Sequence, residues 1–252
     1  MKILINGICG KMGRILYQFV ISSCKDVVVS EGVDLPKNIK QFSCDFKNVK
    51  LYSDLKSSLD CDVVVDFSIA SSLDGVLDFC KSKHIPLVIA TTGHTKSQIK
   101  KILKYSSFFP IYKSANMSQG ITAMMSCIKN LTEKLADWDI EIIETHHRAK
   151  VDAPSGTAIE MYNAIKSVKN DSKMITNRGK GLARQTDDVG IMSIRGGNVI
   201  GKHVIQFMTD DEILTISHEA LSKEVFARGA IEACKLICKY EKGIFSNKNI
   251  FD

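Results

Sequence analysis

The segment from residue 144 to 157 reads Glu-Thr-His-His-Arg-Ala-Lys-Val-Asp-Ala-Pro-Ser-Gly-Thr and holds residue types well suited to chemistry. Nitrogen-bearing side chains are concentrated at His146, His147, Arg148 and Lys150. The end of the segment, Ser155-Gly156-Thr157, predicts a helix N-terminus, where free N–H groups favour anions. Histidine titrates near neutral pH and lysine binds carboxylates, so we predict a site for a carboxylate-bearing substrate with two kinds of proton donor. The alternative is a solvated basic loop.

A glycine-rich segment follows the first predicted strand, residues 2–6. Gly7, Gly10 and Gly13 have the spacing Gly-x-x-Gly-x-x-Gly and lead into an amphipathic helix. Strand, glycine turn and helix in this order are typical of a dinucleotide-binding loop, where the backbone approaches a pyrophosphate at a helix N-terminus. The alternative is a tight turn without a ligand, because the common fingerprint is Gly-x-Gly-x-x-Gly.

An acidic residue, Asp34, ends the second predicted strand, residues 27–33. It follows the last glycine by about twenty residues, where an acid accepts the hydroxyls of a nucleotide ribose. The alternative is a solvated acid at a strand end.

Strand-like and helix-like segments alternate through the first half of the chain. Further strands are predicted at residues 61–67, 86–90 and 108–112, and helices at 70–83 and 95–105. This alternation predicts an α/β fold with a Rossmann-type doubly wound parallel sheet, which binds ligands at the carboxyl ends of its strands.

The pattern changes after residue 118. The sequence predicts helices at residues 120–135 and after Pro154, with Thr157 to Glu160 as the capping box of the second helix. Strands are predicted at residues 140–143, 189–194, 204–208 and 213–218, and a last helix at 223–240. We therefore expect a C-terminal α+β domain with a mixed sheet at residues 118–224. The dinucleotide-binding domain would comprise residues 1–117 and be completed by the last helix, about 225–252.

Composition favours an ordinary globular protein: of 252 residues, 44% are hydrophobic and 25% charged, with a net charge of +6. No nucleic-acid-binding motif, apolar run of membrane-spanning length, signal peptide or cluster with metal-ligand spacing is recognised. The eight cysteines form no Cys-x-x-Cys pair, which indicates free thiols in a reducing cytoplasm. We expect no metal, no nucleic acid and no membrane as partners, and a cytoplasmic protein.

Six motifs occur in a characteristic order: Gly7-x-x-Gly10-Lys-Met-Gly13, Val65-Asp-Phe-Ser68, Ala90-Thr-Thr-Gly93, Ala115-Asn-Met-Ser118, the segment 144–157, and Ser193-Ile-Arg-Gly-Gly197. In these motifs the chain resembles the 4-hydroxy-tetrahydrodipicolinate reductase family, formerly dihydrodipicolinate reductase, of the bacterial diaminopimelate–lysine pathway. The resemblance covers nearly the whole length, and the segment 144–157 is its most specific part.

The resemblance implies an NADH- or NADPH-dependent reductase that acts on a small dicarboxylate ring and assembles as a homotetramer. By resemblance, His146 is the proton donor–acceptor, Lys150 is a second proton donor, and His147, Gly156 and Thr157 contact substrate. The implied cofactor contacts are Gly7, Ile8, Cys9, Gly10, Lys11 and Met12 at the pyrophosphate, Asp34 at the adenosine ribose, and Ala90, Thr91, Thr92, Ser114, Ala115, Asn116 and Met117 at the nicotinamide.

The sequence leaves open which of the two cofactors is used and allows two rival functions. NADPH-using relatives can carry a basic residue where Leu35 stands, so this sequence favours NADH, although Lys37 is close enough to assist NADPH. The rival functions are another NAD(P)-dependent dehydrogenase of an amino-acid pathway and a non-catalytic dinucleotide sensor. His203 is interpreted as a structural or surface residue, and Arg195 as a turn residue or one near substrate or a subunit interface.

Overall fold

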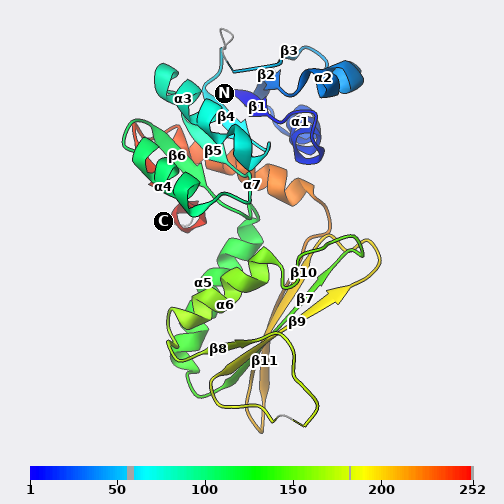
Figure 1. The fold of residues 1–252 in the computed structure, drawn as a ribbon, viewed down its shortest axis with the longest axis vertical. Coiled ribbons are helices and arrows are strands. Elements are labelled where there is room, and N and C mark those ends of the chain that lie inside the picture. Colours follow the sequence, from blue (N-terminus) through cyan, green and yellow to red (C-terminus); the bar gives the residue numbers. More distant parts are fainter. Residues whose placement is uncertain (56–59, 182, 251–252) are drawn as a thin grey trace. The chain divides into compact units, whose positions relative to one another are not determined.

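The computed structural model describes residues 1–55, 60–181 and 183–250. The chain forms two compact units (Figure 1). The first comprises Met1–Ser118 and the chain from Lys223 onward, and the second comprises Gln119–Ser222. Each unit has its own sheet and its own buried core.

The sheet of the first unit has seven strands among the described residues, all parallel, in the order β12-β6-β5-β4-β1-β2-β3. The strands are β1 (Lys2–Asn6), β2 (Val28–Val33), β3 (Lys50–Tyr52), β4 (Val63–Asp66), β5 (Leu87–Ile89), β6 (Pro110–Lys113) and β12 (Gly243–Phe245). The order reverses between β1 and β4, which confirms the predicted doubly wound sheet. Such sheets bind ligands at the carboxyl ends of the strands beside this reversal.

Helices cover both faces of this sheet. One layer contains α1 (Lys11–Ser23) and α7 (Glu224–Ile237), and the other contains α3 (Leu73–Lys83) and α4 (Lys96–Tyr105). Successive residues of β1 face opposite layers: Ile3 and Ile5 pack with α1 and α7, whereas Leu4 packs with α3. A strand buried on both faces is mostly apolar, and for this reason residues 3–5 of β1 form a continuous apolar run.

Some short elements carry no signal that sequence reasoning recognised. Helix α2 (Pro36–Phe42) begins at a proline, but none of its residues is buried, so no apolar periodicity marks it. Strands β8 (Lys173–Ile175) and β12 have three residues each, too few to show a period of two.

Among its described residues, the second unit has a mixed five-stranded sheet in the order β11-β10-β7-β9-β8. Besides β8, its strands are β7 (Asp139–His146), β9 (Asp188–Arg195), β10 (Lys202–Met208) and β11 (Ile213–Glu219). Strand β7 runs parallel to β9 and antiparallel to β10, which confirms the predicted mixed sheet. Helices α5 (Gln119–Lys134) and α6 (Gly156–Lys166) cover one face, over a core that includes Ile142 and Phe207 (Figure 1).

One local prediction in this unit is confirmed but too short, and another is wrong. The strand predicted at residues 140–143 extends to His146, because its pairing with β9 and β10 continues through that length. His146 therefore ends a strand instead of lying in the following loop. Helix α6 does not begin with a capping box at Thr157, because its N-cap is Ser155, whose Oγ accepts a hydrogen bond from the N–H of Ala158 at 3.2 Å.

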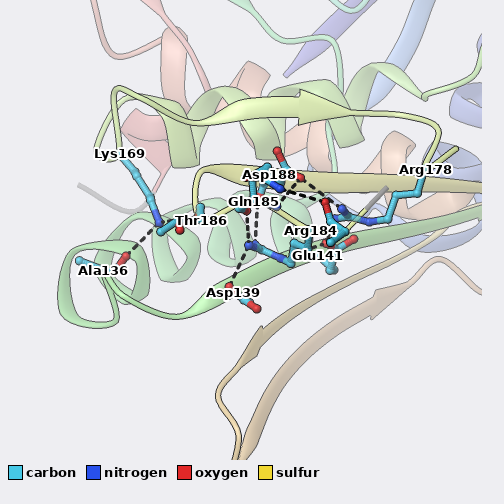
Figure 2. A network of polar contacts seen from close by, with 10 residues as sticks. Ala136, Asp139, Glu141, Lys169, Arg178, Arg184, Gln185, Thr186 and Asp188 are labelled. Atoms are coloured by element: carbon cyan, nitrogen blue, oxygen red, sulfur yellow. Dashed lines mark hydrogen bonds and ion pairs between the residues drawn. The ribbon is translucent and has the colours of Figure 1, made fainter. Parts of the chain in front are cut away.

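The connection between β8 and β9 is held to β7 by ion pairs, as Figure 2 shows. Arg178 pairs with Glu141 and, at 3.3 Å, with Asp188, and Arg184 pairs with Asp139 at 2.8 Å. Glu141 fits there because its strand neighbour is Gly190, whose Cβ, if present, would lie 1.8 Å from Glu141 Oε2. Charged contacts, not apolar packing, thus fix this polar connection.

Candidate active site

The glycine loop between β1 and α1 is built by close backbone contacts. Gly7 has a φ of +81°, and a Cβ there would lie 2.7 Å from the carbonyl oxygen of Phe67. A Cβ on Gly13 would lie 2.2 Å from the carbonyl oxygen of Gly7. The N-cap of α1 is Gly10, so no side chain caps the N–H groups of the first helical turn, which begins at Lys11 and is where an anion binds to a helix. Such a cradle fits a pyrophosphate.

Asp34 holds the end of β2 to this loop. Its Oδ2 accepts a hydrogen bond from the N–H of Cys9 at 2.8 Å, and its Oδ1 accepts from the N–H of Leu35 at 2.8 Å and from Asn38 Nδ2 at 2.6 Å. The side chain of Cys9 is buried. Burial, aided by the Asp34 carboxylate, raises the pKa of Cys9 to about 11, so the group is a packed thiol without thiolate reactivity.

A buried carboxylate, Asp66, connects the ends of three strands. Its Oδ1 accepts from Asn6 Nδ2 at the end of β1 (2.8 Å) and from Ser68 Oγ (2.5 Å). Its Oδ2 accepts from Thr91 Oγ1, just after β5, at 2.9 Å. The sequence marks the Asp66–Ser68 segment only as part of a motif; the structure shows that it fixes two segments predicted to bind cofactor.

The segment after β6 is fixed by the C-terminal part of the chain. Ser114 Oγ donates to the carbonyl oxygen of Asn116 at 2.7 Å, and Asn247 Nδ2 donates to the same oxygen at 2.6 Å. On α7, a Cβ at Gly229 would lie 1.7 Å from the carbonyl oxygen of Met117, so only glycine permits this approach. Sequence reasoning missed Gly229 and Asn247, which are distant in the chain from the loop they support.

The predicted cofactor residues thus lie in four segments at the carboxyl ends of β1, β2, β5 and β6 of one sheet. Ile8 and Cys9 are buried, and their N–H groups donate to the carbonyl oxygen of Val33 at 3.3 Å and to Asp34 Oδ2 at 2.8 Å, so both residues shape the loop from within. Thr91 is also buried, whereas Thr92 and Ala115 are exposed and Ala90 is half-buried.

The second unit holds a buried ion cluster around His146. Nδ1 of His146 lies 2.5 Å from Glu144 Oε2. Glu144 has no exposed surface and receives both terminal nitrogens of Arg195, with Nη1 2.8 Å from Oε2 and Nη2 2.7 Å from Oε1. Glu144 Oε1 also accepts the N–H of Ser155 at 3.2 Å. Sequence reasoning missed Glu144, although a strand running to His146 would have put both residues on one face, two positions apart.

The charges in this cluster shift the pKa of Glu144 and the pKa of His146. Burial alone would raise the pKa of Glu144, but hydrogen bonds from Arg195, Ser193 and His146 outweigh it and lower the pKa to about 2. Burial lowers the pKa of His146; Lys150 and Arg195 lower it further, while Glu144 opposes them. Because Glu144 is ionised and can only accept, the hydrogen of neutral His146 lies on Nδ1 and Nε2 is the free nitrogen.

A second histidine, His203 on β10, packs against the first. It is 4% exposed, its Nε2 lies 3.2 Å from Ser155 Oγ, and its ring meets that of His146 edge-on at 5.2 Å between centroids. Burial, with the nearby charge of His146, lowers the pKa of His203 to about 4, so it is neutral at physiological pH. His203 therefore lies within the site as a neutral, packed ring, and its interpretation as a structural residue stays a prediction.

The loop from His147 to Pro154 carries the remaining predicted residues. The ammonium of Lys150 lies 2.8 Å from Asp152 Oδ1. The backbone N–H of Lys150 donates to the carbonyl oxygen of His147 at 3.1 Å. Arg195 Nη2 donates to the carbonyl oxygen of Asp152 at 2.6 Å, so the same arginine holds this loop and Glu144. Gly156, the first residue of α6, is exposed with open space where a Cβ would be.

This unit therefore brings His146, Lys150 and the N-terminus of α6 into one strand–loop–helix segment, with His147 and Thr157 half-buried beside them. Among residues 1–55, 60–181 and 183–250, no group of three or more His, Cys, Asp or Glu side chains has the arrangement of a metal site. Within the same ranges no helix has the length and apolar character needed to cross a membrane.

Comparisons with known proteins match the whole chain. The family model described as dihydrodipicolinate reductase, N-terminus, matches residues 1–117, and the one described as dihydrodipicolinate reductase, C-terminus, matches residues 120–251. Relatives named 4-hydroxy-tetrahydrodipicolinate reductase include those of Clostridium novyi, 36% identical over 99% of this chain and 97% of its own length, and of Rickettsia bellii, 40% identical over 96% and 91%.

A solved structure titled dipicolinate bound dihydrodipicolinate reductase, from Paenisporosarcina sp. TG-14, has the same fold. Its TM-score is 0.82 at 22% identity, and the match covers 98% of this chain and 97% of that one. Since the family models and the relatives both extend over nearly the full length, this chain belongs to the dihydrodipicolinate reductase family.

Proposed function

We propose that this chain reduces 4-hydroxy-tetrahydrodipicolinate to tetrahydrodipicolinate with NADH or NADPH, in the biosynthesis of diaminopimelate and lysine. Relatives aligned over nearly their full length carry the name of this activity. One observation carries the assignment: in one unit His146 and Lys150 lie in the strand and loop that lead into the N-terminus of α6, while the other unit has a dinucleotide-type glycine loop.

The roles of the residues follow from their chemistry. When bound, the nicotinamide cofactor supplies the hydride. In its protonated, imidazolium form His146 donates a proton from Nε2, because the hydrogen on Nδ1 is committed to Glu144. Lys150 binds one carboxylate of the substrate and provides a second donor, and His147 lies beside it as a further contact. The N–H groups of Gly156 and Thr157 bind the other carboxylate.

A dicarboxylate substrate fits this arrangement of cations and N–H groups, and a structural neighbour is described as bound to dipicolinate. The deciding experiment follows NADH absorbance with enzymatically generated 4-hydroxy-tetrahydrodipicolinate. We expect NADH to be oxidised only when both the substrate and the enzyme are present. Cofactor binding without turnover would favour a dinucleotide sensor, and turnover only with other aldehydes or ketones would favour a different dehydrogenase.

We expect NADH to be used at least as well as NADPH. The carboxylate of Asp34 is held at the end of β2, where it accepts ribose hydroxyls and repels a 2′-phosphate, and Leu35 offers no compensating charge. Lys37, three residues after Asp34, is the cation that would let NADPH be used as well. The ratio of kcat/KM for the two cofactors decides the matter.

Asp34→Ala provides the matched variant for this comparison. This variant should lower kcat/KM for NADH and reduce the difference in kcat/KM between NADH and NADPH. The reason is that the acceptor of the ribose hydroxyls and the charge that repels the 2′-phosphate disappear together. A strong wild-type preference for NADPH would contradict the assignment of Asp34.

We propose that the chain assembles as a homotetramer through the face of the second sheet that α5 and α6 leave uncovered. This face carries apolar side chains on four neighbouring strands, including Ile143, Val204, Ile194 (50% exposed) and Ile213 (61% exposed). Polar and charged side chains such as Glu141 share this face, but exposed apolar side chains on four neighbouring strands are commonly buried in a closed symmetric assembly. Light scattering at micromolar concentration should give four times the mass of the chain.

Ile213→Glu should dissociate this assembly, because it places a charge on the shared face. Ile21→Glu is the control, since Ile21 is 58% exposed on α1 and lies in the other unit. A wild-type protein that is a stable, active monomer would refute the tetramer.

We further propose a cytoplasmic location. All eight cysteines are free thiols in the structure, including the buried Cys80 and Cys234. Thiols that stay reduced are typical of a cytoplasmic enzyme.

A further inference from the structure

Glu144 is the point at which three parts of the second unit meet. Its carboxylate accepts from the ring of His146 on its own strand, from the guanidinium of Arg195 at the end of β9, and from the N–H of Ser155, the N-cap of α6. Every group around it is a donor. A carboxylate without exposed surface is tolerated only when it is paired and hydrogen-bonded in this way.

We propose that Glu144, held in place by Arg195, is a positioning residue for the reductase reaction: it keeps the hydrogen of His146 on Nδ1 and presents Nε2 to the substrate. This inference rests on the proposed function for its kinetic consequences, but the state of the His146 ring can be measured without turnover.

The surroundings of the ring agree with this role. A Cβ on Gly201 would lie 3.2 Å from His146 Nε2, so the glycine leaves room beside the nitrogen that must reach the substrate. His203 packs edge-on against the ring and fixes its plane. Because His203 is neutral at physiological pH, it adds no charge that would compete with Glu144.

The same carboxylate also links the proton donor to the predicted anion-binding helix end. Glu144 Oε1 accepts the N–H of Ser155, whose Oγ caps α6 by accepting from Ala158. The next two residues, Gly156 and Thr157, are the predicted carboxylate contacts. Glu144 therefore sets the distance between the proton donor and the substrate-binding N–H groups.

Four groups determine the charge state of His146. Glu144 stabilises the imidazolium, Arg195 and Lys150 oppose it, and neutral His203 contributes burial. Removing the charge of Glu144 should therefore lower the pKa of His146, and removing Arg195 should raise it, because Glu144 would then act on His146 without a competing cation. A change that merely loosened the fold would not give shifts of opposite sign.

The experiment compares the pH dependence of kcat in the full-length wild type, Glu144→Gln and Arg195→Met. Since His146 donates a proton, kcat falls as the pH rises through its pKa. We expect this fall to move to lower pH in Glu144→Gln and to higher pH in Arg195→Met, by on the order of one pH unit each. In Glu144→Gln, kcat should also drop about a hundredfold while KM changes less.

Nitrogen NMR of the His146 ring gives the readout independent of turnover. In Glu144→Gln the amide oxygen should stay with Arg195 and Ser155, so the amide NH2 faces Nδ1 and the ring hydrogen moves to Nε2. Glu141→Gln is the matched control: it lies on the same strand and pairs with Arg178, but points to the opposite face. It should leave both the tautomer and the pH profile unchanged.

Retention of the Nδ1–H tautomer and of the wild-type pH profile in Glu144→Gln would overturn the proposal, as would shifts of the same sign in both variants. If Glu144→Gln does not fold, the direction of the shift in Arg195→Met decides alone. A wild-type protein without reductase activity would contradict the proposed function, while the tautomer would still test the role of Glu144.

Discussion

Lys150→Ala is expected to lower kcat/KM by on the order of a hundredfold or more. The substitution removes a cation and a proton donor at once, and it leaves the carboxylate of Asp152, which repels a substrate carboxylate, without the ammonium 2.8 Å away. Steady-state kinetics with 4-hydroxy-tetrahydrodipicolinate measures the effect. NADH affinity, measured by fluorescence titration, should stay close to wild type, because Lys150 lies outside the unit that carries the glycine loop.

Lys202→Ala is a suitable control for the charge change. Lys202 also lies in the second unit and pairs with the carboxylate of Glu219 at 3.4 Å. It stands on strand β10, however, and not in the loop that carries Lys150. This variant should retain most of its activity. Normal turnover in Lys150→Ala would remove Lys150 from the proposed chemistry.

His146→Ala is expected to reduce mainly kcat, by on the order of a hundredfold, with a smaller change in KM. The reason is that Nε2 supplies a proton in the reaction, while the binding groups at Lys150 and α6 remain. In the wild type, kcat should fall as the pH rises through the pKa of His146, which burial lowers from its ordinary value. The variant should lack this pH-dependent fall.

His147→Ala is the comparison that separates the two neighbouring histidines. Because His147 is assigned to substrate binding, its removal should raise KM more than it lowers kcat. A pH–rate profile of unchanged shape in His146→Ala would argue against His146 as the proton donor.

Local sequence patterns were sufficient to predict β1, β2, β4, β5 and β6 of the first sheet and to mark two segments for the predicted sites. The apolar run before Gly7 predicts β1 because a strand covered on both faces is mostly apolar. The glycines of the next turn are required by backbone contacts that leave no room for a Cβ. His146 and Lys150 stand out because their residue types and spacing lie within one short segment.

Only the tertiary structure shows which distant residues complete the site. Arg195 is opposite His146 because β7 and β9 pair in parallel, and His203 is opposite Glu144 because β10 and β7 pair antiparallel. These registers depend on how the sheet packs on α5 and α6, and a shift by one residue would turn every side chain to the other face. Local sequence does not determine which strands pair. The ion pair between Glu144 and His146, and the contact of Arg195 with Glu144, were therefore identified only in the folded structure.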